Sequence, residues 1–340
     1  MAAKRPARNW GLIGASTIAR EWMVKAIRAQ DDTEIRAMMS RDRARGEAFS
    51  REFEIAQAYD SLEAMLGDPE IDAVYIGTTN DRHHGEVLAA AAAGKHVLCD
   101  KPIATSLAQA SEMIAACERA GVTLAVNHHL RNAATHRAIR ATIEAGTLGR
   151  IVTVRVAHGA MLPKHLQTWR IQDPSTGAGA VLDLAVHDAD LLRFLLDDEI
   201  IEVEAMTANT GLAAGGIEDT AVAIGRTKSG TLISFQDVFN TPFNRNGVEI
   251  HGTEGSIFAT NVLTQFPQGE VRLRDVAGER ELPVEHEDLY QRGVRRFVAA
   301  TRGEDNVPAS GLDGARSLAV ALAILDSAKT GTVTTVAAIA

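Results

Sequence analysis

The sequence predicts an α/β protein with two domains: the first contains a parallel sheet, and the second is an α/β domain with an open, mainly antiparallel sheet. Short apolar runs alternate with helix-patterned stretches up to residue 127, which is typical of a parallel sheet with helices on both faces. After about residue 150, apolar and polar residues alternate, as in strands that bury one face. The length of 340 residues suits two domains. We expect them to span 1–128 and 129–340.

The elements of the first domain follow from the spacing of its apolar residues. The expected strands are continuous apolar runs, at 10–15, 34–39, 73–77, 95–99 and 122–127. The expected helices repeat apolar residues at helical spacing, at 17–29, 43–53, 82–93 and 107–120. Gly94 and Gly121 follow two of these helices, where a glycine commonly ends a helix.

The second domain shows the shorter period of antiparallel strands. Its expected strands lie at 151–158, 221–227, 231–239, 248–252, 256–260 and 270–273. Lys228-Ser229-Gly230 has the composition of a hairpin turn between two of these strands. Three helices are expected, at 181–196, 289–301 and 312–327.

The composition excludes several classes of protein. The chain has 35 Lys+Arg against 44 Asp+Glu, and a net charge of −9 argues against a general nucleic-acid binder. Two cysteines, Cys99 and Cys117, cannot build a disulfide framework or a Cys-rich zinc site, so we expect buried free thiols. Met1–Arg8 is basic, but no signal-peptide stretch follows it. The alanine-rich run Val87–Ala93 is far below the roughly 20 residues of a membrane span. We therefore expect a soluble, cytoplasmic protein with no membrane partner.

A glycine turn follows the first expected strand. Gly14-Ala15-Ser16-Thr17-Ile18-Ala19 approximates G-x-G-x-x-G/A, in which the backbone turns tightly and a pyrophosphate approaches the helix N-terminus. Ser16 replaces the second glycine: its hydroxyl could contact phosphate, but its Cβ limits close backbone approach. A plain tight turn is the alternative. The position of the motif inside a βαβ alternation favours dinucleotide binding.

The end of the second strand bears on which dinucleotide is bound. An NAD protein usually places Asp or Glu there, whereas this chain has Ser40, followed by Arg41, Arg43 and Arg45. A hydroxyl with nearby guanidinium groups suits a 2′-phosphate, so the pattern favours NADP. Two alternatives remain: the arginines solvate a helix start, or Asp42 serves NAD.

Polar segments follow two further strands of the parallel sheet. Thr78-Thr79-Asn80, with His83 close behind, follows one strand, and Asp100-Lys101-Pro102 follows the next. Ligands bind at these strand ends in open α/β sheets. Lys101 is held in extended geometry by the proline, and the bond between them could be cis. A structural lysine directed to solvent is the alternative.

Asp183 and His187 stand four residues apart in an apolar helical stretch, so they are expected on one helix face. A satisfied core histidine is the alternative to a proton-transfer pair. Asp188 and Asp190 are expected to begin a solvated or capping face. The remaining candidates for a metal site are histidines, at 128, 129, 136 and 158. They lack supporting Cys or carboxylate spacing, so we expect no metal.

Taken together, these motifs resemble the Gfo/Idh/MocA oxidoreductase family over nearly the whole chain. The segments that carry the resemblance are Gly14–Ala19, Thr79-Asn80 with His83, Asp100-Lys101-Pro102 and Asp183–His187. Longer runs are similar to the family's NADPH-dependent sugar-ketone reductases, at 10–22, 38–40, 127–134, 165–167 and 169–170. Two departures are mild. Asp100 stands where the family usually has Glu, and Ala178 and Ala180 interrupt the glycine run before Asp183.

The resemblance implies a Rossmann domain followed by an open-sheet α/β domain, with substrate held between them over the nicotinamide. It implies catalysis by Lys101, Asp183 and His187, with His187 protonating the alkoxide, Lys101 supplying positive charge and Asp183 orienting His187 or a substrate hydroxyl. The implied NADP(H) contacts are Gly14, Ser16, Thr17, Ile18, Ala19, Ser40, Arg41, Arg45, Thr78, Thr79, Asn80, His83, Lys101, Asn127, Trp169 and Arg170. The implied sugar contacts are His128, His129, His165 and Trp169.

Two other functions fit the same resemblance. One is a different sugar or inositol dehydrogenase of the family, in which the substrate lining would differ. The other is a non-catalytic nucleotide-sensing regulator, which could dispense with Lys101 and His187. The strand patterns do not decide between a monomer and a homo-oligomer.

Overall fold

The computed structural model describes residues 5–339, so Met1–Lys4 of the basic N-terminal segment lie outside the described residues. The chain divides into two compact units. The first comprises 1–128 together with 290–315, and the second comprises 129–289 together with 316–340. We expected 129–340 to form the second domain throughout, so the assignment of 290–315 to the first unit is a correction.

Aromatic packing explains why 290–315 joins the first unit. Helix α9 (Leu289–Thr301) places Phe297 against Trp10 of the first strand, with ring centroids 5.3 Å apart, and both side chains are fully buried. Tyr290 stacks on Trp22 at 5.1 Å. Contacts between residues so distant in sequence are invisible to a local pattern.

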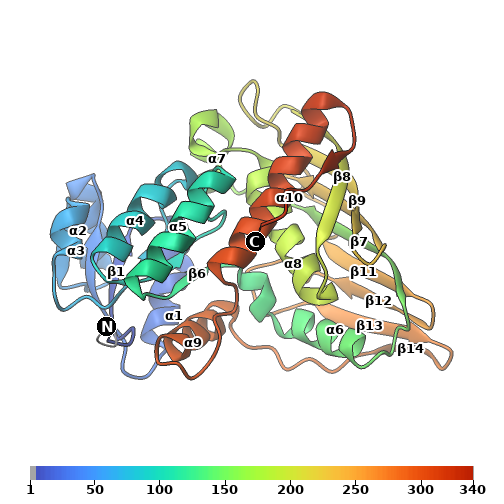
Figure 1. The fold of residues 1–340 in the computed structure, drawn as a ribbon, viewed down its shortest axis with the longest axis horizontal. Coiled ribbons are helices and arrows are strands. Elements are labelled where there is room, and N and C mark those ends of the chain that lie inside the picture. The colour runs from blue at the N-terminus through green and yellow to red at the C-terminus, as the bar shows by residue number, and fades with distance from the viewer. Residues whose placement is uncertain (1–4, 340) are drawn as a thin grey trace. The chain divides into compact units, whose positions relative to one another are not determined.

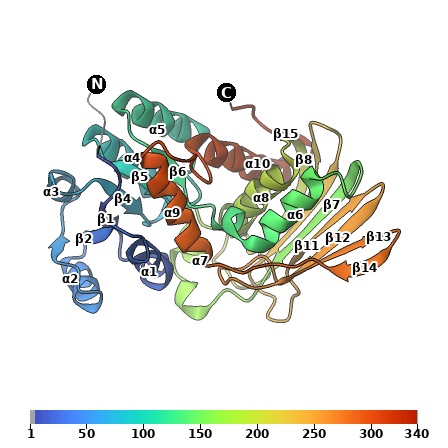
Figure 2. The ribbon, with the colours of Figure 1, turned by 90° about the horizontal axis from the view of Figure 1, so that it is seen from below.

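Within the described residues, the first unit is built on a six-stranded parallel sheet of order β3-β2-β1-β4-β5-β6. The strands are β1 (Asn9–Ile13), β2 (Glu34–Met39), β3 (Gln57–Tyr59), β4 (Ala73–Ile76), β5 (His96–Cys99) and β6 (Leu124–Val126). The helical segments are η1 (Ala19–Met23), α1 (Val24–Arg28), α2 (Arg43–Glu52), α3 (Leu62–Leu66), η2 (Asn80–Arg82), α4 (His83–Ala92) and α5 (Leu107–Ala120). Figures 1 and 2 show α4 and α5 on one face of this sheet and α1 and α9 on the other. The prediction of a parallel sheet covered on both faces is confirmed.

Local chemistry sets the boundaries of these elements. All residues of β4 and β5 are buried, as continuous apolar runs in a doubly covered sheet require. Helix α5 begins where the Ser106 side chain accepts a hydrogen bond from the Gln109 N–H. It ends at Gly121, whose φ of 64° is the left-handed conformation that favours glycine. Because all strands of this sheet are parallel, their carboxyl ends lie at the same edge of the sheet.

Three features of the first unit differ from the expected pattern. The short elements β3 and α3 were not predicted, although the Ser61 side chain caps α3 by accepting a hydrogen bond from Ala64 N–H. The helix expected at 17–29 begins as the π-helical turn η1 and only then becomes α1.

The described part of the second unit contains a nine-stranded sheet of order β14-β13-β12-β11-β7-β10-β9-β8-β15. Its strands are β7 (Ile151–Gly159), β8 (Ile200–Ala208), β9 (Thr220–Thr227), β10 (Leu232–Val238), β11 (Gly247–Gly252), β12 (Gly255–Thr260), β13 (Glu270–Asp275), β14 (Gly278–Glu281) and β15 (Thr334–Thr335). Every pair is antiparallel except β7 with β10, which is parallel. The mainly antiparallel sheet is thus confirmed.

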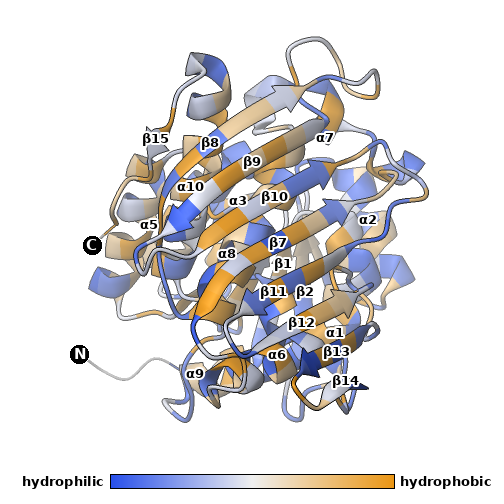
Figure 3. Ribbon diagram, turned by 90° about the vertical axis from the view of Figure 1, so that its right-hand side faces the viewer, coloured by the Kyte–Doolittle hydropathy of each residue, from blue (hydrophilic) through white to orange (hydrophobic). Residues whose placement is uncertain are grey.

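The remaining helical segments are η3 (His129–Asn132), α6 (Ala134–Glu144), η4 (Lys164–Leu166), α7 (Trp169–Gln172), η5 (Pro174–Thr176), η6 (Val181–Ala185), α8 (Val186–Leu196) and α10 (Gly311–Thr330). Helices α6 and α8 and the later part of α10 lie along one face of the second unit's sheet (Figures 1 and 2). Figure 3 looks onto the other face, where hydrophilic and hydrophobic residues alternate along the strands. In β10, Ile233 and Phe235 are buried, whereas Leu232, the first residue of the strand, is exposed.

Two findings bear on the expectations from composition. Cys99 and Cys117 are both buried free thiols, as expected. Among the described helices, none combines the length and apolar character that crossing a membrane requires.

Candidate active site

The glycine turn brings the ends of two central strands together. Gly14 follows β1 with a φ of +95°, and a Cβ there would lie 2.8 Å from Cγ2 of Thr78, which follows β4. Only glycine fits both the conformation and this space. The Ser16 hydroxyl accepts a hydrogen bond from Ala19 N–H at 3.1 Å, so the replacement of a second glycine caps the first helical turn. Strand order reverses between β1 and β4, which is where such sheets bind ligands.

Arg45 reaches the same turn from helix α2. Its Nη2 donates a hydrogen bond to the Ala15 carbonyl at 2.6 Å. Asp42 caps α2 by accepting from Arg45 N–H at 3.1 Å, so its carboxylate is already engaged by the helix. Arg43 instead pairs with Glu47 on the exposed side of the helix, at 2.9 Å. Ser40 follows β2 and is nearly buried, at 9% exposure.

Hydrogen bonds connect the segments that follow β4 and β5. The Thr78 hydroxyl donates to Glu86 Oε2 at 2.6 Å, and Arg82 pairs with the other Glu86 oxygen at 2.8 Å. Burial raises the pKa of Glu86, against the opposing effects of Thr78 and Arg82. His83 is fully buried, and its Nδ1–H donates to the Pro102 carbonyl at 2.9 Å. His83 thereby fixes the start of α4 to the Lys101-Pro102 segment, whose peptide bond is cis.

Asp100 holds the backbone of Lys101 and the side chains of two neighbours by hydrogen bonds. Its Oδ1 accepts from the Lys101 backbone N–H at 3.2 Å and from Asn127 Nδ2 at 3.3 Å. Its Oδ2 accepts from the Tyr75 hydroxyl at 3.2 Å. Burial, followed by the Asp100 charge, raises the pKa of Tyr75 well above its usual range, so this hydroxyl stays a donor. Asp100, which stands where the family usually has Glu, therefore accepts hydrogen bonds through both of its carboxylate oxygens.

In the second unit, Asp183 lies on η6 beside Arg170 of α7. The Arg170 Nε is 3.6 Å from Asp183 Oδ2, and the guanidinium lies over the Trp169 ring at 4.6 Å. Gly179 precedes η6 with a φ of +110°, where a Cβ would lie 2.1 Å from Glu218 Oε1. This glycine is required for the close approach of Glu218, whose Oε1 accepts from Val181 N–H at 3.2 Å.

His187 lies in the first turn of α8 and is 6% exposed. The ring of His129 meets it edge-on with centroids 4.8 Å apart, and the ring of His158 lies at 6.5 Å. We expected Asp183 and His187 to lie on one face of a regular α-helix. The residues before His187 instead form the π-helical turn η6, so the two side chains are not related by regular α-helical geometry. π-Helical turns occur frequently at functional sites.

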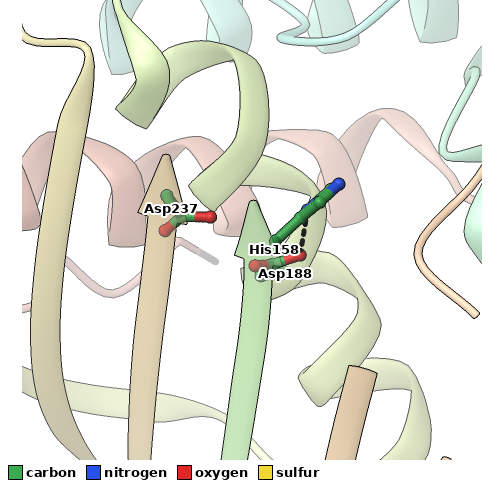
Figure 4. Close-up of side chains that lie close together, drawn as sticks. All are labelled: His158, Asp188 and Asp237. Carbon is green, nitrogen blue, oxygen red and sulfur yellow. Dashed lines mark hydrogen bonds and ion pairs between the residues drawn. The ribbon is translucent and has the colours of Figure 1, made fainter. Parts of the chain in front are cut away.

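His158 also belongs to a group that the sequence analysis missed. Figure 4 shows its side chain beside those of Asp188 and Asp237, and its Nδ1 lies 2.8 Å from Asp188 Oδ1. In the part of the chain that the structure describes, this is the one group of His, Cys, Asp or Glu side chains close enough to hold a metal, with candidate atoms within 4.8 Å of one another. The available signal was a charged residue at a core position of an alternating strand, which both His158 and Asp237 occupy.

Two expectations are corrected here. Asp188 and Asp190 do not begin a solvated face, because they are 0% and 1% exposed. Asp190 accepts two hydrogen bonds from Arg131, at 2.6 and 2.8 Å, which neutralises its buried charge. His158 does have carboxylates nearby, although they are 30 and 79 positions away along the chain (188 − 158 and 237 − 158).

The roles of the other predicted cofactor and sugar contacts stay predictions. In the first unit these are Thr17, Ile18, Arg41, Thr79, Asn80 and the buried His128. In the second unit, Trp169 is half-buried on α7, and His165 is exposed on η4.

Comparison with known proteins gives a consistent result. Residues 8–128 match the Gfo/Idh/MocA oxidoreductase family with an NAD-binding Rossmann fold, and residues 136–258 match the Gfo/Idh/MocA C-terminal domain. A 1,5-anhydro-D-fructose reductase of Ensifer adhaerens is 48% identical over 95% of this chain and 97% of its own length. D-xylose 1-dehydrogenase (NADP(+)) 2 of Haloferax volcanii is 30% identical over 95% of this chain and 98% of its own. A levoglucosan dehydrogenase solved in complex with NADH and levoglucosan has the same fold, with a TM-score of 0.88 at 23% identity over 98% of this chain and all of its own.

Proposed function

Because this chain belongs to the Gfo/Idh/MocA oxidoreductase family, we propose that it is an NADPH-dependent reductase of a sugar ketone, converting 1,5-anhydro-D-fructose to 1,5-anhydro-D-mannitol. The observation that carries the substrate is the 48% identity to the Ensifer adhaerens reductase, which extends over 95% of the chain. A match of that extent covers most of both units.

The residues around the glycine turn fit a phosphorylated dinucleotide. Gly14 lets the chain turn tightly against Thr78 at the strand ends where such sheets bind a pyrophosphate. Arg45 already lies at this turn through its bond to Ala15, and Asp42 is occupied by its helix. Ser40 adds a hydroxyl and no repelling carboxylate. Ser40 and Arg45 would hold the 2′-phosphate, which favours NADP(H) over NAD(H).

The chain's own residues perform the proton chemistry of the proposed reaction. When bound, the reduced nicotinamide supplies a hydride to the C2 carbonyl carbon. His187 donates a proton to the oxygen as negative charge develops there. Lys101, whose backbone N–H is held by Asp100, supplies positive charge that stabilises this oxygen in the transition state. Asp183, paired with Arg170, orients a substrate hydroxyl or His187.

The test is the loss of NADPH absorbance with purified protein and 1,5-anhydro-D-fructose, with NADH in a parallel reaction. We expect turnover of 1,5-anhydro-D-fructose that is faster with NADPH than with NADH. We expect NMR to identify the product as the mannitol epimer. The glucitol epimer would contradict the proposed hydride face. Binding of NADPH, seen by fluorescence, without turnover would reject the substrate.

A second candidate is an NADP-linked dehydrogenase of an aldose or inositol. It is favoured by the 30% identity, over 95% of this chain, to the Haloferax volcanii D-xylose dehydrogenase. Oxidation of D-xylose or an inositol with NADP⁺, at a kcat/KM above that for anhydrofructose reduction, would replace the first proposal. Failure of every polyol and ketose, with NADPH binding retained, would favour a nucleotide-sensing regulator.

A further inference from the structure

Two buried carboxyl groups, those of Asp188 and Asp237, lie near His187, the proposed proton donor. Strands β7 and β10 pair in parallel, and their register places Asp237 directly opposite His158. Both residues continue the buried face of their strands, after Val156 and Phe235 respectively. Asp188 enters the same space from α8, one residue after His187. Figure 4 shows the Asp188 carboxyl joined to His158 by the dashed line, with Asp237 on the neighbouring strand.

The carboxyl oxygens of this cluster have few partners. Asp188 Oδ1 lies 2.8 Å from His158 Nδ1, at hydrogen-bond distance. Asp188 Oδ2 and both Asp237 oxygens are buried with no hydrogen-bond partner among the described residues. Asp188 and Asp237 are 0% and 1% exposed. Two adjacent buried carboxylates cannot both stay ionised without a compensating charge, so one proton must be held here.

Sharing that proton satisfies the geometry. If Asp237 is the acid, its hydroxyl can donate to Asp188, which remains the acceptor for His158. Burial raises the pKa of Asp188, and burial together with the Asp188 charge raises the pKa of Asp237 well above its usual range, so the pair retains a proton that isolated carboxyls would lose. Carboxyl pairs that share one proton in this way carry a single negative charge near neutral pH.

A bound metal ion is a poorer occupant. A metal would need the lone pair of a deprotonated His158 nitrogen. When Asp188 is the ionised member of the pair, the Nδ1 atom that faces the carboxyls carries the proton of their 2.8 Å contact and offers no lone pair to a metal. The cluster is therefore arranged to hold a proton.

The single charge is close enough to affect His187. The His158 ring lies 6.5 Å from the His187 ring, and Asp188 is the next residue of the helix. As a general estimate, a unit charge acting over about 7–10 Å at an effective dielectric constant of about 20 shifts the pKa of an ionisable group by about one to two units.

We propose that Asp188 and Asp237 share one proton, and that their single negative charge, acting beside and through His158, stabilises protonated His187 as the proton donor. This inference rests on the proposed function of His187. His158, Asp188 and Asp237 are then positioning residues, because they act on the reaction through His187 and do not touch substrate.

Other titratable and charged groups in this unit act on the same region. Those on α8 and on the elements that pack against it are His129, Arg131, His136, Arg137, Arg140, Glu144, Asp183, Asp190 and Arg193, with Arg170 beside Asp183. Asp190 is neutralised by Arg131, and Arg170 pairs with Asp183. His136 stays neutral, because burial lowers its pKa to about 4.

The test compares pH profiles of kcat for reduction in the wild type, Asp188→Asn and Asp237→Asn. Reduction needs protonated His187, so kcat falls as pH rises through its apparent pKa. Asp188→Asn removes the charge beside His158, and we expect that apparent pKa to fall by about one unit. Asp237→Asn keeps a charge on Asp188, so its profile should shift by less. The control is Asp197→Asn, which removes an exposed charge from the end of the same helix.

Difference infrared spectroscopy reports on the proton without turnover. At pH 7 the wild type should show the carbonyl band of a buried carboxylic acid, which Asp237→Asn removes. The proposal is overturned if no such band exists, if Asp188→Asn leaves the kinetic pKa unchanged, or if purified protein carries one equivalent of metal that Asp237→Asn loses. His187→Gln separates the failures: unchanged kcat there rejects the proton donor itself, whereas a reduced kcat with an unshifted Asp188→Asn profile rejects only this inference.

Discussion

The Arg45 guanidinium donates a hydrogen bond to the Ala15 carbonyl at 2.6 Å, and so ties the start of α2 to the glycine turn. This contact holds a cation at the turn before any cofactor binds. The proposed NADP preference therefore depends on a side chain that is already positioned, with less conformational entropy to lose on binding.

Replacing Arg45 should discriminate between the two cofactors. Charge-assisted hydrogen bonds contribute about 1.5–3 kcal/mol, so Arg45→Ala should raise the NADPH KM by about 10–100-fold. The NADH KM should change far less, because NADH carries no 2′-phosphate. Arg43→Ala is the matched control, since Arg43 starts the same helix but pairs with Glu47 on its exposed side. Equal effects of Arg45→Ala on both cofactors would reject the phosphate assignment.

His187→Gln should lower kcat by about 10²–10⁴-fold, the usual contribution of general acid catalysis. NADPH binding, measured by fluorescence titration, should persist because the first unit is unchanged. His286→Gln, at an exposed histidine of the same unit, should leave kcat unchanged. A wild-type kcat in His187→Gln would exclude His187 as proton donor.

The buried acid pair should make the protein less stable as pH rises. Burial and the Asp188 charge raise the folded-state pKa of Asp237 well above the unfolded value of about 3.9, so the folded chain binds more protons once pH exceeds about 4. This contribution to stability is complete below about pH 4 and decreases as pH rises above that value. Asp237→Asn should flatten the dependence by more than about 1 kcal/mol between pH 5 and 8, measured by thermal unfolding. If stability falls equally with rising pH in Asp237→Asn and in the wild type, the prediction is contradicted.

His136 should produce the opposite dependence in acid. Burial lowers its folded-state pKa to about 4, below the unfolded value of about 6.5, and its Nδ1–H donates to the Leu130 carbonyl at 2.9 Å. The unfolded chain therefore binds the extra proton, and stability is lost as pH falls from about 6.5 toward 4. His136→Gln should show a shallower acid loss of Tm than the exposed control His286→Gln. An identical loss in both variants would show that His136 does not contribute.

Local sequence signals were sufficient for elements whose ends are set by neighbouring residues. The predicted ranges 34–39, 107–120 and 289–301 match β2, α5 and α9 residue for residue. Continuous apolar character, a capping serine and a terminal glycine are all contained within such short segments. Helix α6 was not predicted, although its pattern of apolar positions is as helical as that of α9.

Long-range pairing limited the prediction of the site. The packing of Phe297 on Trp10 assigns 290–315 to the first unit, and no local pattern contains that contact. The parallel register of β7 and β10 places Asp237 opposite His158, although 79 residues separate them (237 − 158). Alternation alone marked these positions as core-facing, so a charged residue at a core position was the signal to follow. The motif residues of the glycine turn and of Asp100-Lys101-Pro102 were local, and the structure shows how each is held.

The most direct test of the central claim is NMR of the product formed from 1,5-anhydro-D-fructose and NADPH deuterated at C4 of the dihydronicotinamide. Transfer of the label to C2 of 1,5-anhydro-D-mannitol, at a rate that falls with His187→Gln, is the predicted result. An absence of labelled product from wild-type protein that binds NADPH would contradict the proposed reaction.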